Sequence, residues 1–194
     1  PQAAVQPVRR FALRWWGEED AAWLQELDRQ LAQAQSAMPD QPRLQRVQGE
    51  AAQHADVLQV YARSTASWVD ALRPYCAEQD PRPQLLIDLA YHHTVVLGPW
   101  VVPGQTACLA CMGLRTVRRW GDAAVPAQPL ALAQAGLSVA LLLQVLRASA
   151  EVGGQVAWVE HSLQFDLRSL QTQRVRVYRQ PWCPACSGQV AQDG

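Results

Sequence analysis

The stretches "GQTACLACMGLRT" at residues 104–116 and "QPWCPACSG" at residues 180–188 each contain two cysteines separated by two residues. Zn²⁺ favours four ligands in a tetrahedron, and a C-x2-C turn supplies two thiolates from one short segment. Such a site would fasten the end of the chain to the loop after residue 104 and enclose everything between. The sequence therefore predicts one structural zinc site, with the ligands Cys108, Cys111, Cys183 and Cys186.

Other uses of four thiols are weaker fits. "PWCPAC" at residues 181–186 is similar to a redox-active dithiol, whose first thiol is activated at a helix N-terminus, but only eight residues follow Cys186. Neither pair is followed by histidine, which excludes covalent haem attachment. Iron–sulfur ligation stays open. Zinc with four protein ligands has no free position for water, so we predict a structural role and no catalytic residue.

The composition of the 194-residue chain excludes several classes of function. The length fits one domain with a sizeable core. Seventeen basic and seventeen acidic residues cancel, so neither nucleic acid nor an anionic membrane is an expected partner. The chain contains no lysine, which excludes a P-loop phosphate contact and a Schiff base.

Location signals are few. The longest apolar run, residues 131–146, is interrupted by polar residues and is too short to span a bilayer. No signal-peptide pattern opens the chain, and the absence of an initiator methionine leaves room for a missing upstream segment. Five cysteines, four of them in C-x2-C pairs, suit a metal site in a reducing cytoplasm better than a secreted disulfide framework.

Hydrophobic periodicity predicts alternating strands and helices in the first half of the chain. Strands are predicted over residues 8–16, 43–48, 56–62 and, divided near His92 and His93, 83–104. Helices are predicted within residues 17–37 and 67–79, where Asp20 and Ser67 are candidate N-caps. This rhythm is typical of an α/β sheet that is largely parallel in its first half.

The second half has a different pattern. Residues 114–122 are polar and predict a short helix or a loop. Residues 129–151 are rich in leucine and valine and predict a buried helix. Residues 155–180 alternate well enough to predict two or three antiparallel strands.

Residues 55–112, which include "VVLGPWVVPGQTACLACM" at 95–112, resemble the middle of ubiquitin-activating E1-like proteins of the ThiF/MoeB type. In that superfamily a strand, a helix, a second strand and G-x4-P-G-x3-C-x2-C follow in this order. The later helix, the β-rich tail and the closing C-P-x-C extend the resemblance to residue 187. Residues 8–54 are similar only in the order of their elements.

The resemblance implies an α/β fold: an E1-like, Rossmann-related sheet with flanking helices, a β-rich C-terminal part and a C-x2-C/C-x2-C zinc site. It implies one domain over residues 1–194, with a degenerate Rossmann-like half at 8–104 and a zinc-fastened half at 105–188. More narrowly, the chain is similar to the E1-like component of cyclodehydratases that make thiazoles and oxazoles in ribosomal peptides, including bacteriocins.

The chain departs from an adenylating E1-like protein at three places. The turn "RWWGEEDAAW" at residues 14–23 has one glycine, the adjacent tryptophans Trp15 and Trp16, and three carboxylates, whereas phosphate binding there needs a glycine-rich loop with free amides. The acidic residue that the family places after its middle strand is missing from "YARST" at 61–65. The family's catalytic lysine cannot exist in a lysine-free chain. ATP activation is therefore not expected.

The resemblance implies a non-catalytic scaffold that binds the leader region of a precursor peptide and presents it to a YcaO-type cyclodehydratase. An edge strand could accept the peptide by β-augmentation. No winged-helix-like peptide-binding module is visible, and homodimerisation is a further implication. The alternative is a divergent E1-like adenylyltransferase that activates a peptide carboxylate with ATP. A zinc-ribbon nucleic-acid binder is disfavoured by the neutral charge.

Several other residues are expected to be structural. Cys76 is interpreted as a buried small apolar residue, and His92 and His93 as turn residues. Glu160, His161 and Ser162 are consecutive in a strand, so they cannot form a hydrolase triad. A solvated cationic face near the zinc is expected from the residues that offset the thiolate charge, namely Arg115, Arg118, Arg119 and Arg179. Core or interface positions are expected for Trp15, Trp16, Trp100, Trp120 and Trp158.

Overall fold

One seven-stranded sheet organises the computed structural model, which describes residues 7–37, 43–78, 80–151 and 157–187. The strand order is β2-β1-β3-β4-β5-β6-β7. The strands are β1 (Arg10–Trp16), β2 (Gln45–Arg46), β3 (Leu58–Arg63), β4 (Gln84–Tyr91), β5 (Thr94–Val101), β6 (His161–Asp166) and β7 (Thr172–Arg176).

The sheet changes direction at its centre. β2, β1, β3 and β4 are parallel, which confirms the prediction for the first half. β5, β6 and β7 are antiparallel to their neighbours. The β4–β5 hairpin turns at His92 and His93, as predicted, and His92 has a φ of 25°.

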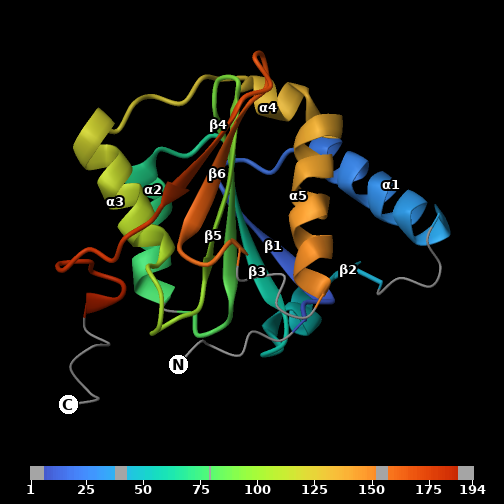
Figure 1. Ribbon diagram of the computed structural model, residues 1–194, viewed down its shortest axis with the longest axis horizontal. Helices are drawn as coiled ribbons and strands as arrows, with labels where there is room; N and C mark the ends of the chain where they lie inside the picture. Colours follow the sequence, from blue (N-terminus) through green and yellow to red (C-terminus); the bar gives the residue numbers. More distant parts are fainter. Residues whose placement is uncertain (1–6, 38–42, 79, 152–156, 188–194) are drawn as a thin grey trace.

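Helices cover both faces of the sheet (Figure 1). The helices α1 (Ala21–Ala37) and α5 (Ala135–Ala150) lie on one face, and α2 (Trp68–Glu78) and α3 (Leu109–Trp120) lie on the other. Short elements complete the structure: the 3₁₀ helix Gly49–Gln53 and α4 (Leu130–Ala133). The fold class is thus mixed α/β with flanking helices.

Local sequence explains the first two helices. Trp23, Leu27 and Leu31 are spaced four residues apart and form the buried face of α1. The Asp20 carboxylate accepts a hydrogen bond of 2.8 Å from the Trp23 N–H, so Asp20 caps α1 as predicted. Ser67 likewise caps α2, because its hydroxyl accepts a bond of 3.1 Å from the Asp70 N–H.

Two helices differ from their predictions. The segment predicted as a short helix or loop is the second part of α3, which begins inside the first C-x2-C pair at Leu109. The arginines that make residues 114–122 polar face outward, while Leu109, Met112 and Gly113 are buried. The helix predicted over 129–151 is interrupted at Gln134, whose φ of −100° and ψ of 49° separate α4 from α5. Residues 155–180 contain β6 and β7, with 155 and 156 outside the described residues.

Gly113 permits the close approach of α3 to α2. A Cβ at this position would lie 2.5 Å from Cε3 of Trp68 and 3.0 Å from Cδ1 of Leu72. Gly113→Ala should therefore lower the free energy of unfolding by about 1–3 kcal/mol, although alanine favours helices. Urea unfolding measures the change.

Gly136 in α5 is the matched control, because its added Cβ would meet only Glu26 Oε1 at 3.6 Å. Gly136→Ala is expected to leave stability unchanged or slightly raised. Equal effects of the two substitutions would contradict the close contact.

Candidate metal centre

The four predicted cysteines come together at one buried point. Their sulfur atoms all lie within 4.8 Å of one another. The Sγ–Sγ distances are 3.8 Å for Cys108–Cys111, 3.4 Å for Cys108–Cys183 and 3.5 Å for Cys111–Cys186. None forms a disulfide. Zinc–sulfur bonds of about 2.3 Å in a tetrahedron place sulfurs about 3.8 Å apart, so the cluster has the dimensions of a tetrathiolate site.

Secondary structure positions the first pair. Cys108 is the N-cap of α3, and Cys111 lies in the first turn of the helix. Residues three apart on a helix share a face, so both sulfurs point the same way. The loop before them is fixed by Thr106, whose hydroxyl accepts a hydrogen bond of 2.9 Å from the Val102 N–H.

The second pair lies in turns after β7. The Cys183 N–H donates to the Gln180 carbonyl at 3.1 Å, and the Ser187 N–H donates to the Cys183 carbonyl at 2.9 Å. The Gln180 N–H also donates to Cys111 Sγ at 3.3 Å. This last bond joins the two halves of the cluster directly and satisfies part of the sulfur's negative charge.

Arg179 has a more specific role than charge compensation. Its guanidinium donates to the Gly104 carbonyl at 2.6 Å and to the Thr106 carbonyl at 3.3 Å. The loop preceding the first pair is thus fastened to the segment preceding the second pair, beside the thiolates. The sequence predicts a positive charge near the thiolates at Arg179, but it gives no sign of the two carbonyl partners.

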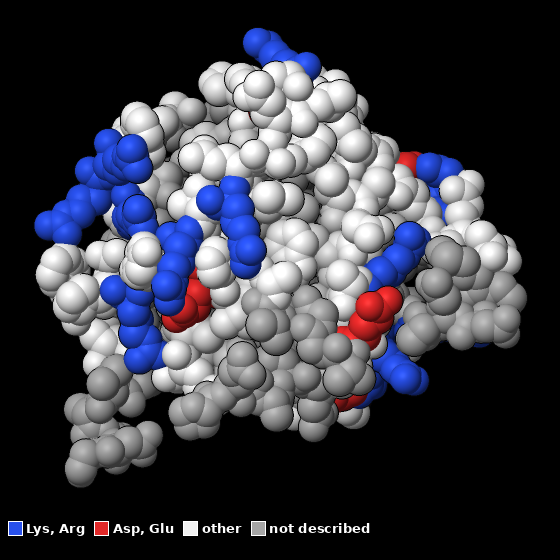
Figure 2. Space-filling view, in the orientation of Figure 1, with Lys and Arg blue, Asp and Glu red and all other residues white. Residues whose placement is uncertain are grey.

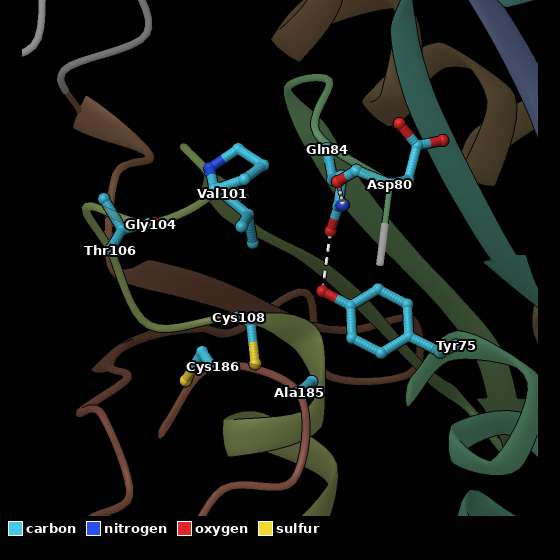
Figure 3. Close-up of a pocket in the computed structure, with 10 residues that line it drawn as sticks. Tyr75, Asp80, Gln84, Val101, Gly104, Thr106, Cys108, Ala185 and Cys186 are labelled. Carbon is cyan, nitrogen blue, oxygen red and sulfur yellow. Dashed lines mark hydrogen bonds between the residues drawn. The ribbon is translucent and has the colours of Figure 1, made fainter. Parts of the chain in front are cut away.

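Tyr75 on α2 and Gln84 on β4 lie beside the cluster and are hydrogen-bonded to each other (Figure 3). The Tyr75 hydroxyl donates to Gln84 Oε1 at 2.7 Å and accepts from the Leu109 N–H at 3.3 Å, at the start of α3. Burial raises the pKa of Tyr75 far above its usual value, so the phenol stays protonated. A small pocket beside Cys108 and Cys186 is lined by both polar side chains. No sequence motif indicated this contact between α2 and β4.

The four cysteine side chains form hydrogen bonds with one another. Hydrogen bonding within the cluster lowers the pKa of Cys111 and Cys183 and raises the pKa of Cys108 and Cys186, so the four thiols share the negative charge unequally. The thiolate is the metal-binding form. Four cysteine sulfurs fit Zn²⁺ or iron, which soft sulfur ligands favour. A metal ion bound by all four would have no free coordination position for a substrate.

The β1–α1 turn is held against the segment after β3 by hydrogen bonds, and both border an open depression lined by Gly17, Glu18, Thr65 and Asp70. Gly17 has a φ of 97°, and a Cβ there would lie 2.5 Å from both the Thr65 hydroxyl and the Ala66 nitrogen. The Glu18 N–H donates to Thr65 Oγ1 at 2.9 Å, and the Ser64 hydroxyl donates to the Glu18 carbonyl at 2.6 Å. The Glu18 amide and the Glu18 carbonyl are therefore both used inside the protein.

A buried ion pair lies beside this turn. Arg63 and Asp88 are paired in the register of β3 and β4, and their charged groups are 2.8 Å apart. Their side chains are 1% and 0% exposed. The guanidinium carbon also lies 4.6 Å from the Trp68 ring and 4.7 Å from the Tyr91 ring. The segment "YARST" at residues 61–65 contains no acidic residue, and its arginine, Arg63, is buried.

The remaining expectations have mixed outcomes. Cys76 is half-buried rather than buried, at the edge of the α2 packing surface, and burial raises its pKa. Glu160, His161 and Ser162 form no triad, since the His161 ring bonds the Val159 carbonyl at 2.8 Å. Trp16 and Trp100 are buried, but Trp120 is 71% exposed.

No described helix has the length and apolar character needed to cross a membrane. The sequence matches no family model, and the search of curated proteins finds no relative. Solved structures, in contrast, share the fold. One chain of the E. coli microcin synthetase McbBCD complex matches with a TM-score of 0.65 and 11% identity, over 94% of this chain and 69% of that chain.

Two heterocyclases give similar matches. The heterocyclase TruD matches with a TM-score of 0.58 and 18% identity, over 93% of this chain. A heterocyclase in complex with substrate and cofactor matches with a TM-score of 0.60 and 14% identity, also over 93%. The chain spans only 28% and 26% of these two proteins. The three matches are with parts of two heterocyclases and with one chain of a microcin synthetase complex, and at these low identities the likeness establishes the fold alone.

Proposed function

We propose that this chain is a non-catalytic E1-like subunit that presents a ribosomal precursor peptide to a YcaO-type cyclodehydratase. In this proposal residues 8–104 and 105–188 are the two halves of one domain, and a structural zinc ion bound by Cys108, Cys111, Cys183 and Cys186 fastens the second half. The observation that carries the proposal is the internal use of the nucleotide turn, on a fold shared with heterocyclase components.

Physical chemistry supports the lack of catalysis. Phosphate binding needs backbone N–H groups that point into an open turn, whereas the Glu18 amide bonds Thr65. Two carboxylates at Glu18 and Glu19 would also repel a triphosphate. The sulfur cluster offers a metal no open position. Such a protein contributes by binding and orientation, which raise the effective concentration of the peptide at its partner enzyme.

The test is reconstitution with a YcaO-type enzyme and a short precursor rich in Cys, Ser and Thr, each sought among the genes beside that of this chain. With ATP present, mass spectrometry counts the waters lost as rings form. Adding the chain should raise the rate by about 100-fold through effective concentration. An unchanged rate would contradict the presenting role.

The adenylyltransferase alternative predicts a different result for the chain alone. We expect no pyrophosphate exchange with ATP and any candidate peptide, and no heat of ATP binding in calorimetry. Micromolar ATP binding by the isolated chain would favour the alternative.

A further inference from the structure

A groove separates α3 from the last two strands. Its volume is about 250 Å³, and Arg115, Arg119 and Trp120 line it from α3. Gln173, Val175 and Arg176 line it from β7. Neither the four clustered cysteines nor the β1–α1 turn lines this groove, so it is a separate surface.

The groove lies in a local excess of positive charge. Arg side chains gather on the side of the molecule where α3 and the C-terminal strands lie, with little acidic surface among them (Figure 2). The cluster consists of Arg115, Arg118 and Arg119 on α3 and Arg176 on β7. Within the described part of the chain, the one ion pair to a carboxylate in this cluster joins Arg176 to Glu160 at 3.3 Å.

Outside this cluster, six of the thirteen other arginines have carboxylate partners in the described part of the chain, against one of the four within it. Ion pairs are formed by Arg10, Arg14, Arg29, Arg46, Arg63 and Arg82. Because the whole chain has no net charge, the surplus on this face is local. An anionic partner would supply the missing charges.

Aromatic side chains hold the guanidinium groups in place. Arg118 lies 5.0 Å from the Trp182 ring, and Arg119 lies 5.0 Å from the Trp120 ring. Trp120 and Trp182 are 71% and 62% exposed. Exposed tryptophan beside arginine is typical of binding surfaces, and stacking limits the side-chain motion that binding must otherwise restrict.

β7 provides an open backbone edge next to the arginines. It is the last strand of the described sheet. The Val177 N–H donates to the Glu160 carbonyl at 2.7 Å, on the β6 side. Backbone groups alternate in direction along an antiparallel strand, so those of Arg174 and Arg176 point outward. The Arg176 carbonyl accepts a hydrogen bond of 3.3 Å from the Arg115 guanidinium, which leaves the Arg174 backbone groups and the Arg176 N–H for an extended peptide.

We propose that an acidic, extended peptide segment adds to β7 as a further strand, with its carboxylates facing the arginine cluster of α3 and β7. The inference rests on the proposed function, because it gives the precursor peptide a binding place and a charge. Strand addition supplies affinity through the main chain, and Arg115, Arg119 and Arg176 supply the preference for Asp and Glu. A nucleic acid would use the charges but not the strand edge.

The experiment uses a fluorescein-labelled synthetic peptide that alternates Glu or Asp with Val or Thr. Fluorescence anisotropy measures its binding to the full chain over a range of salt concentrations. Three probes are compared with it: the same peptide with Gln and Asn, the same peptide with alternate backbone amides N-methylated, and a single-stranded oligonucleotide of equal charge. N-methylation removes strand pairing and leaves the charges.

The matched variants are Arg115→Gln and Arg119→Gln, with Arg43→Gln as the control. Arg43 is exposed next to β2, at the other end of the sheet. Each groove substitution should weaken binding about tenfold, as expected for a charged hydrogen bond, and the control should not. Binding should also fall as salt rises.

Each outcome decides the inference. Weaker binding of the Gln/Asn and N-methylated peptides, together with weaker binding by the two groove variants, supports it. Equal binding by those variants overturns it, as does equal or tighter binding of the oligonucleotide. If no peptide binds, the arginines serve only to protect the strand edge, and the inference fails. Reconstitution that still depends on the chain would then leave the proposed function standing.

Discussion

Replacing Cys111 with serine is expected to abolish stoichiometric metal binding and to cost most of the protein's stability. Cys111 Sγ contacts Cys108 and Cys186 and accepts the Gln180 N–H, so one substitution disrupts both halves of the cluster. Structural zinc sites contribute on the order of 10 kcal/mol to folding, and whole domains have a stability of about 5–15 kcal/mol. Metal analysis of the purified protein and thermal unfolding by circular dichroism measure the two effects.

Cys76 provides the matched control for this experiment. It is the one cysteine outside the cluster, and it is half-buried. Cys76→Ser should retain a full equivalent of metal and a melting temperature close to that of the original protein. Full metal content in the Cys111 variant would contradict the four-sulfur site, and iron instead of zinc in the original protein would contradict the proposed metal.

Replacing Asp88 with alanine is expected to lower the free energy of unfolding by about 3–5 kcal/mol. The substitution leaves the Arg63 guanidinium buried between Trp68 and Tyr91 without its counter-charge. It also removes the acceptor of the Ala90 N–H, at 3.0 Å from Asp88 Oδ1. For a chain of this size the melting temperature should fall by roughly 6–20 °C. Urea unfolding at constant pH measures the free energy.

Two controls separate the ion pair from general damage. The double substitution Arg63→Met with Asp88→Leu removes both charges and should recover much of the lost stability. Asp28→Ala breaks an exposed pair with Arg46, in which Asp28 is 53% exposed, and should have little effect. A single Asp88 variant as stable as the Asp28 variant would show that the buried pair is not important for folding.

The elements best predicted from sequence are those with local causes. The four-residue spacing of Trp23, Leu27 and Leu31 predicted α1, and Asp20 predicted its start. Both features depend only on residues within one or two helical turns. The extent of α3 was underestimated, since Arg118 and Arg119 make its second half polar. Only packing of the opposite face against Trp68, made possible by Gly113, reveals a full helix there.

The functional site divides in the same way. The two C-x2-C pairs predicted the four clustered residues, because the type of side chain and the short spacing within each pair can be read directly from the sequence. The supporting contacts of Tyr75 with Leu109 and of Arg179 with Gly104 join segments far apart in the chain. Such contacts carry no periodic signal and could not be predicted.

The sequence by itself therefore determined the class of fold, the four cysteines that cluster and the absence of a glycine-rich turn after the first strand. The tertiary structure decided the contacts around that turn: strand register sets Arg63 against Asp88, and the Glu18 amide bonds Thr65. It also decided that arginines from α3 and β7 share one groove. The physical reason is that composition and spacing act along the chain, whereas charge pairing depends on which segments the sheet brings together.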